Sequence, residues 1–320
     1  MTRVADLEAR PATLDDATIV SDIQTAIDPD DPSDPQITRY QWKTAPPWPR
    51  ERFLLELAGR AVGFAYHAHA PWEEMSQRFG WVGAYLQPTE HTRERAMAAW
   101  DLVEERSRAE GTRTFTVWAF EKQTDLIAIL VERGYAEERR GKGWELDLVT
   151  NRERLERMAE ESLERMRGEG IAVLTLAADA DPEAEQKLWQ VWQESLQDVP
   201  TTMPIPTVPF DQWRKWLSKP GVARDAVWIA REGEAIVGVS ALSYPPVRGN
   251  VWTDYTGTAR SVRGRGVARA LKLQTVMQAI GRGVPRVRTG NDAANAPILH
   301  LNEEMGYRQF GGGIQYLKPA

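Results

Sequence analysis

Residues 251–266 read VWTDYTGTARSVRGRG, and this stretch decides the fold of the second half of the chain. Residues 251–259 alternate in character as a β-strand does, and the apolar residues of 267–280 follow with helical spacing. Between them, Gly264 and Gly266 allow a tight turn and a close approach of the backbone to an anion. The free N–H groups of the first helical turn attract the same anion. The segment therefore predicts strand, glycine turn and helix in the layout of a phosphate site.

Basic residues gather at this turn. Positions 260–272 hold five positive charges and no negative one, on Arg260, Arg263, Arg265, Arg269 and Lys272. A diphosphate would require such a cluster, and a solvated basic surface is the alternative interpretation. The mononucleotide pattern Gly-x-x-x-x-Gly-Lys-Ser/Thr is absent, and the dinucleotide pattern of three glycines and a later acid fits poorly. The turn alone therefore leaves the ligand open.

The chain contains one pattern twice. Residues 52–64 (RFLLELAGRAVGF) predict strand, glycine turn and strand, and residues 226–239 (AVWIAREGEAIVGV) repeat them. Residues 132–135 (ERGY) match residues 304–307 (EMGY) at an offset of 172. Because 320 residues suit two ordinary domains, we expect similar domains at 1–150 and 170–320. A charged linker helix is expected over 151–169.

Two blocks of the second half carry a family resemblance. Residues 263–268 (RGRGVA) look like an Arg/Gln-x-x-Gly-x-Gly/Ala loop, and residues 289–307 place an asparagine before a helix that ends in Gly-Tyr. Both blocks resemble the signatures of the GNAT N-acetyltransferase superfamily. The resemblance implies an α+β fold of two tandem GNAT domains, each a mixed, splayed β-sheet flanked by helices. It also implies a likeness to mycothiol synthase and related tandem acetyltransferases.

The resemblance further implies acetyl-CoA as the cofactor, bound in the second half. A backbone N–H near residues 256–258 would polarise the thioester carbonyl, and the loop would grip the pyrophosphate. The residues expected to bind the cofactor are Thr256, Thr258, Ala259, Arg260, Arg263, Gly264, Arg265, Gly266, Val267, Ala268, Asn295 and Asn302.

The first half lacks the same features. At the 172-residue offset, the residues aligned with the loop are His91, Thr92, Glu94 and Ala96. No glycine remains there, and the Glu94 carboxylate would repel a diphosphate. Gln123 and Leu130 replace the two asparagines of the second block. We therefore expect no tight binding of coenzyme A in the first half, which would complete the substrate pocket or the domain interface.

A general base is not obvious. The family's usual base lies on the strand before the loop, six residues before Thr258, and this chain has Trp252 there. Tryptophan cannot accept a proton. Asp254 projects from the same face and is the preferred substitute, with a pKa that burial would raise. A structural or substrate-orienting Asp254, with water as the base, is the equally weighted alternative.

The usual acid is also replaced. Many members carry a tyrosine four residues before the Gly-Tyr/Phe pair, and Asn302 stands here. Asparagine can hydrogen-bond the thiol or the pantetheine amide but cannot deliver a proton. Solvent or a tyrosine would protonate the leaving group, and Tyr255 and Tyr307 are the nearest candidates. Tyr307 reads better as a core residue, because its counterpart Tyr135 lies in the half expected to be inactive.

The sequence thus predicts an acyltransferase that moves the acetyl group of acetyl-CoA to a small-molecule amine by direct attack. The alternative is a non-catalytic acyl-CoA sensor or scaffold, motivated by the missing base and tyrosine. A net charge of −6 and a pI near 5.5 argue against nucleic acid and anionic membranes as partners. A monomer or a homodimer is expected.

Other compositional features exclude several classes of site. The chain contains no cysteine, which rules out disulfides and a thiolate nucleophile. His67 and His69 share a strand face, but two ligands without a nearby third do not make a metal site, so none is predicted. The longest apolar stretch, 235–242, is far shorter than the roughly 20 residues of a membrane helix. Residues 1–10 do not resemble a secretory signal, and a cytoplasmic location is expected.

Overall fold

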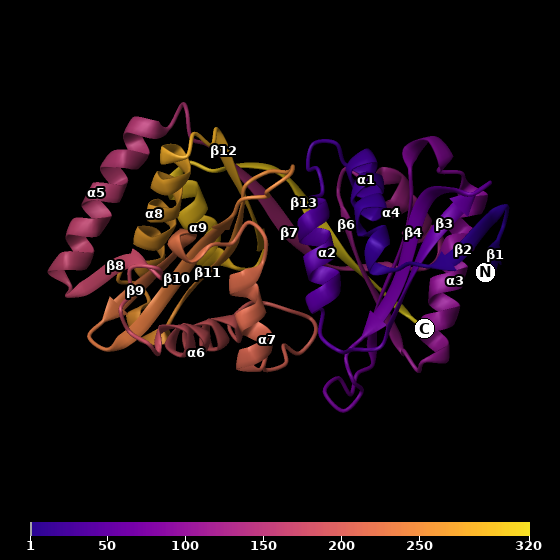
Figure 1. Cartoon of the computed structure of the whole chain (residues 1–320), viewed down its shortest axis with the longest axis horizontal. Coiled ribbons are helices and arrows are strands. Elements are labelled where there is room, and N and C mark those ends of the chain that lie inside the picture. The colour runs from indigo at the N-terminus through magenta and orange to yellow at the C-terminus, as the bar shows by residue number, and fades with distance from the viewer. Residues whose placement is uncertain (1) are drawn as a thin grey trace. The chain divides into compact units, whose positions relative to one another are not determined.

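The computed structural model describes residues 2–320 and divides them into two compact units (Figure 1). Unit 1 contains the described residues up to Gly141 together with Val247–Gly249 and Gly311–Ala320, and unit 2 contains Lys142–Pro246 and Asn250–Phe310. Met1, the first residue of the segment assessed as a signal, lies outside the described residues. Within residues 2–320, no helix is both long enough and apolar enough to cross a membrane.

Unit 1 is built on a sheet in the order β1-β2-β3-β4-β5-β6-β13. Its strands are β1 (Thr2–Val4), β2 (Leu7–Pro11), β3 (Arg50–Leu57), β4 (Arg60–His69), β5 (Phe79–Leu86), β6 (Thr114–Phe120) and β13 (Arg308–Pro319). Neighbours are antiparallel except β5 and β6, which pair in parallel over three residues. The hairpin predicted over residues 52–64 is β3–β4, and Ala58 and Gly59 at its tip both have positive φ.

Helices cover both faces of this sheet. They are α1 (Ala17–Ile27), α2 (Pro35–Thr44), α3 (Arg93–Ala109) and α4 (Thr124–Glu132), with short 3₁₀ turns at Leu14–Asp16 and Pro88–Glu90. Trp100 of α3 and Leu130 of α4 are fully buried in one core with Phe115 of β6. On the opposite face, Val20 of α1 packs against Phe64 of β4. Apolar burial on both faces stabilises the layered unit.

The strands of unit 2 follow the order β7-β12-β11-β10-β9-β8. Its strands are β7 (Ala136–Asp147, in this unit from Lys142), β8 (Ile171–Thr175), β9 (Val227–Glu232), β10 (Ala235–Ser243), β11 (Trp252–Thr258) and β12 (Arg286–Asp292). The hairpin predicted over residues 226–239 is β9–β10. The strands of unit 2, like those of unit 1, include one parallel pair among antiparallel ones, because β11 and β12 run parallel.

The helices of unit 2 also lie on two faces. They are α5 (Arg152–Gly168), α6 (Ala184–Leu196), α7 (Phe210–Arg214), α8 (Val267–Gly281) and α9 (Ala296–Met305), with 3₁₀ turns at Lys215–Ser218, Arg224–Ala226 and Arg260–Val262. Figure 1 shows α5 and α8 on one side and α6 and α7 on the other. Leu155 of α5 shares a core with Leu273 of α8, and Leu188 of α6 shares another with Val239 of β10.

The two compact units do not follow the order of the chain. Gly311–Ala320 belong to unit 1, where β13 pairs antiparallel with β6 from Gly313–Phe120 to Pro319–Thr114. Conversely, the end of β7 belongs to unit 2, next to β12. The helix expected over residues 151–169 forms as α5, but Leu155 and Met166 bury it in unit 2. Self-similarity identifies residues that resemble one another, whereas strand pairing decides where each segment lies.

Candidate active site

Strand β11 leaves one of its edges largely unpaired. It pairs with β10 from Gly238–Thr258 to Ser243–Trp252, but parallel β12 meets it at a single residue pair, Trp252–Arg288. Alternate residues of a strand turn their N–H and C=O groups to opposite neighbours. The groups of residues 254–258 that face β12 therefore lie beyond the parallel ladder. An extended ligand that carries amides can pair with such an edge.

The turn after β11 leads into an uncapped helix. Gly264 and Gly266 have φ of +75° and +89°, a region that favours glycine. Gly266 is the N-cap of α8, no side chain caps this end, and the first turn carries no acidic residue. The N–H of Ala270 donates to the Gly266 carbonyl, so the three preceding N–H groups lie ahead of the first intrahelical bond. These groups and the helix dipole suit an anion.

Three arginines of the turn are already paired with carboxylates. Arg260 and Arg263 both donate to Asp198, which follows α6. The two guanidinium groups hold the pKa of Asp198 well below its usual range. Arg265 pairs with Glu169 at 2.6 Å and with Glu232 at 2.9 Å. An anion that binds at this turn would therefore have to replace these ion pairs, because the three arginines are not free.

The fifth basic residue of the cluster lies in the interior. Only 1% of Lys272 is exposed, because its position on α8 faces the core together with Leu271 and Leu273. Burial lowers the pKa of Lys272 to about 7. Its ammonium is therefore not available to bind a diphosphate. This differs from the expectation based on the five positive charges of residues 260–272. The leucines on both sides of Lys272, Leu271 and Leu273, were the available sequence signal for a buried position.

Lys272 and Asn302 form a buried polar pair. Lys272 Nζ donates to Asn302 Oδ1 at 2.9 Å, and Asn302 Nδ2 donates to Asn291 Oδ1 at 2.8 Å. The ammonium also lies 4.9 Å from the ring centroid of Tyr307. Asn302 has no exposed surface. Both ends of the amide that was expected to contact the cofactor thiol are thus engaged within the protein.

Asp254 sits at an irregularity in β11. The register with β10 shifts between Ala241 and Leu242, which leaves Asp254 as the extra residue of a β-bulge. Its two carboxylate oxygens accept hydrogen bonds from the Trp216 indole and from Lys219 Nζ. The carboxylate thus keeps a cationic neighbour at the strand edge. This pairing was not foreseen, because the two donors lie more than thirty residues earlier in the chain.

Tyr255 and Tyr307 occupy apolar surroundings. The Tyr255 hydroxyl lies 2.8 Å from Ser195 Oγ on α6, and burial raises its pKa. Tyr307 is 4% exposed in the core beside α8, as expected for a core residue, and burial raises its pKa as well. Neither environment favours rapid release of a phenolic proton.

The remaining predicted residues lie along the same path. Thr256 Oγ1 is 2.9 Å from Ser240 Oγ, and Thr258 pairs with Gly238. Ala259 and Val267 are buried around the turn. Asn295 is the N-cap of α9 and is half-buried. The structure therefore gathers the loop residues at the end of β11 and the start of α8.

Residues 186–307 match the Acetyltransferase (GNAT) family, and this range contains β11, the glycine turn, α8 and α9. This part of the chain is therefore similar to a GNAT domain. The similarity supports an N-acetyltransferase that uses acetyl-CoA as its cofactor. A search of curated proteins found no match. The narrower likeness to mycothiol synthase stays a prediction.

Solved structures with the same fold cover nearly the whole chain. A tandem GNAT protein from the clavulanic acid biosynthesis pathway is 16% identical with a TM-score of 0.75, covering 98% of each chain. A GCN5-related N-acetyltransferase from Sphaerobacter thermophilus is 17% identical with a TM-score of 0.70, covering 99% of this chain and 97% of that one. A glucosamine N-acetyltransferase region of a fungal multi-domain β-N-acetylglucosaminidase is 13% identical with a TM-score of 0.70, covering 97% of this chain and 38% of that one. They support the tandem GNAT fold.

Proposed function

We propose that this protein transfers the acetyl group of acetyl-CoA to a small-molecule amine and that the reaction centre lies in unit 2. The uncapped glycine turn before α8, at the end of a strand that parallel β12 barely joins, carries the proposal. Among the solved structures, the fungal region named for glucosamine supports an amine acceptor. The acidic composition also suits a small amine better than one carried by a nucleic acid.

The residues of the turn would hold the cofactor's diphosphate. The N–H groups of residues 267–269 lie ahead of the helix ladder, and Arg263 and Arg260 are within reach once Asp198 releases them. Charge-assisted hydrogen bonds from guanidinium and amide groups are the strong contacts for phosphate oxygens. The strand edge from Thr256 to Thr258 would pair with the pantetheine amides. Bound in this way, acetyl-CoA supplies the acetyl group as an activated thioester.

Asp254 is the proposed acceptor of the amine proton. It lies on the strand that carries the free edge, and its bulge separates it from the regular register. Lys219 pairs with the carboxylate and holds it in place, and each carboxylate oxygen has a further lone pair that can accept a substrate N–H. Tyr255 and Asn302 are held in their own hydrogen bonds, so solvent is the proposed proton source for the departing thiolate.

Thiol release with a panel of amines tests this proposal. Asp254→Asn should lower kcat/KM by about a hundredfold or more, because general-base catalysis is lost, while the affinity for coenzyme A stays unchanged. The matched control is Asp225→Asn, an exposed aspartate of the same unit that pairs with Arg282. Binding of coenzyme A without thiol release for any amine would overturn the proposal in favour of a non-catalytic binder. An unchanged rate for Asp254→Asn would remove Asp254 from the mechanism.

A further inference from the structure

Unit 1 contains a pocket with a volume of about 360 Å³, within the usual size of small-molecule sites. Its lining comes from β3, β4 and β5 and from α1, α2 and the loop that follows α2. The lining residues used below are Trp42, Trp48, Arg50, Arg52, Tyr66 and Trp81. None of residues 88–96, the segment aligned with the cofactor loop of unit 2, lines this pocket. It is therefore a different kind of site from the proposed cofactor site.

Strand register places the polar and aromatic groups on the same face. Arg52 lies opposite Tyr66, and Arg50 lies opposite Ala68 in the β3–β4 pair. Ala68 in turn lies opposite Trp81 in the β4–β5 pair. Residues that face each other across antiparallel strands project to one side of the sheet. The two arginines and Trp81 thus converge beneath α1 and α2.

Aromatic rings form one side of this pocket, which we term the tryptophan wall (Trp42, Trp48 and Trp81). Trp48 and Trp81 are stacked, with ring centroids 5.7 Å apart and planes 7° from parallel. The Arg52 guanidinium lies 4.5 Å from the centroid of the Trp42 ring. Flat apolar surfaces of this kind bind flat apolar ligand groups. The wall therefore sets the shape of an occupant.

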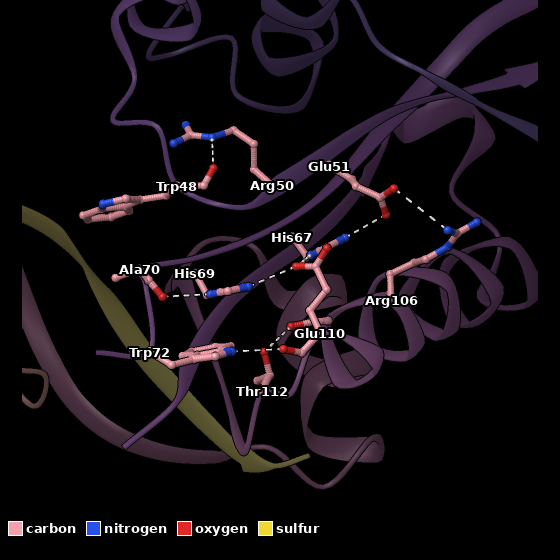
Figure 2. Close-up of polar contacts among 11 residues, drawn as sticks. Trp48, Arg50, Glu51, His67, His69, Ala70, Trp72, Arg106, Glu110 and Thr112 are labelled. Carbon is pink, nitrogen blue, oxygen red and sulfur yellow. Dashed lines mark hydrogen bonds and ion pairs between the residues drawn. The ribbon is translucent and has the colours of Figure 1, made fainter. Parts of the chain in front are cut away.

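The two arginines lack a carboxylate partner within residues 2–320. Arg50 Nε donates to the Trp48 carbonyl at 3.2 Å, as Figure 2 shows, and Arg50 also donates to the Pro46 carbonyl. Arg52 meets the Trp42 ring. Burial lowers the pKa of both guanidinium groups, and the neighbouring charge of Arg50 helps to lower that of Arg52 to about 10. Two adjacent cations without a counterion make an anion favourable here.

Glu51, which lies between the two arginines in the sequence of β3, points to the opposite face. Glu51 alternates with Arg50 and Arg52, and it lies 2.9 Å from His67 Nε2 and 3.9 Å from Arg106. Figure 2 shows this chain of contacts continuing through Glu110 on the α3 side. Glu51 is thus engaged on the other side of the sheet and does not neutralise the pocket.

We propose that this pocket binds a small organic carboxylate with a flat apolar body. The carboxylate pairs with Arg50 and Arg52, and the body lies along the tryptophan wall. Planar guanidinium groups match the two oxygens of a carboxylate, and an occupied pocket would remove the unbalanced charge. This binding step is independent of acetyl transfer in unit 2.

Benzoate, its uncharged analogue benzamide, and inorganic phosphate are the probes, used with the full chain. In the wild-type protein, benzoate should shift the indole N–H signals of Trp48 and Trp81 in ¹H–¹⁵N spectra. Trp118, which is 46% exposed on β6, serves as the internal control and should not shift. Calorimetry should show benzamide and phosphate binding at least about tenfold more weakly, because each lacks one of the two contacts.

Variants test whether the Arg52 guanidinium binds the carboxylate. Arg52→Gln should weaken benzoate binding about tenfold, whereas Arg113→Gln, an exposed arginine of the same unit, should not. Equal binding of benzoate and benzamide, phosphate binding as tight as that of benzoate, or a shift of Trp118 alone would overturn the proposal. Displacement of benzoate by coenzyme A would also overturn it, since the site would then belong to the cofactor. The wild-type spectra decide the matter even if Arg52→Gln fails to fold.

Discussion

The turn before α3 in unit 1 and the turn before α8 in unit 2 occupy matching places. They differ in how the N–H groups of the first helical turn are satisfied. Thr92 caps α3 with its own hydroxyl, which accepts the Arg95 N–H at 3.3 Å, and Glu94 follows in the first turn. Gly266 leaves the end of α8 without a side-chain cap. A side-chain cap satisfies N–H groups at the start of a helix. Without such a cap, these groups remain available to bind an anion.

The buried residues next to the two turns also differ, because they are apolar in unit 1 and polar in unit 2. At the 172-residue offset, Trp100 and Leu130 of unit 1 stand where Lys272 and Asn302 stand in unit 2, and all four are buried. Trp100 packs edge-on against Tyr135, and Lys272 lies over Tyr307 at the corresponding position. One unit keeps an apolar core where the other keeps a buried amine and amide. Such polar groups cost stability unless they are paired.

The largest expected effect comes from copying the residue of unit 1 into the glycine turn. Gly266→Glu should raise the dissociation constant for coenzyme A about a hundredfold, because it strains a positive-φ position and puts a carboxylate on the anion site. Gly283→Glu is the matched control. It also has positive φ, with open space around it, at the other end of α8. Its affinity should stay within about twofold of wild type. Calorimetry that showed equal losses in both variants would remove the distinction between the turns.

A second prediction concerns the buried lysine. The pKa of Lys272 is lowered to about 7 in the folded chain, and an unfolded lysine titrates near 10.4. Between these values the unfolded chain binds more protons, so the free energy of unfolding rises with pH by at most about 1.4 kcal/mol per pH unit. Lys272→Met should lose this rise, as urea unfolding at several alkaline pH values would show.

The exposed Lys215→Met is the control for this measurement and should keep the wild-type slope. Adding Asn302→Leu to Lys272→Met recreates an apolar pair like that of unit 1 and should recover part of the stability, because no unpaired amide is left in the core. An identical slope in the wild type and in Lys272→Met would show that this lysine is not the buried base that the structure indicates.

The smallest expected effect concerns the carboxylate that pairs with the arginines. Asp198→Asn frees Arg260 and Arg263. The affinity for coenzyme A should therefore rise about threefold at low salt, as expected for exposed ion pairs, and less at high salt because of screening. Asp211→Asn, an exposed aspartate on α7, should change neither value. A fall in affinity for Asp198→Asn would mean that this residue orients the guanidinium groups for the ligand.

Local sequence patterns predicted the secondary structure around the glycine turn. The RGRG turn, the strand before it and the helix after it lie within 251–280, and their conformations follow from alternation, positive-φ glycines and helical spacing. The number of positive charges in residues 260–272 did not predict which of them are available to a ligand, because their partners lie far away in the sequence. Asp198 and Glu169 lie far from the arginines that they neutralise, and Lys272 turns inward because of the helix face it occupies.

The sequence by itself determined the duplicated hairpins, the glycine turn before α8 and the absence of such a turn in the first half, because each depends on neighbouring residues. Tertiary structure alone decided that β13 pairs with β6, that Lys219 and Trp216 hold Asp254, and that Arg50 and Arg52 meet beside a tryptophan wall. Strand register and side-chain convergence arise from packing between distant segments, and no local pattern encodes those distances.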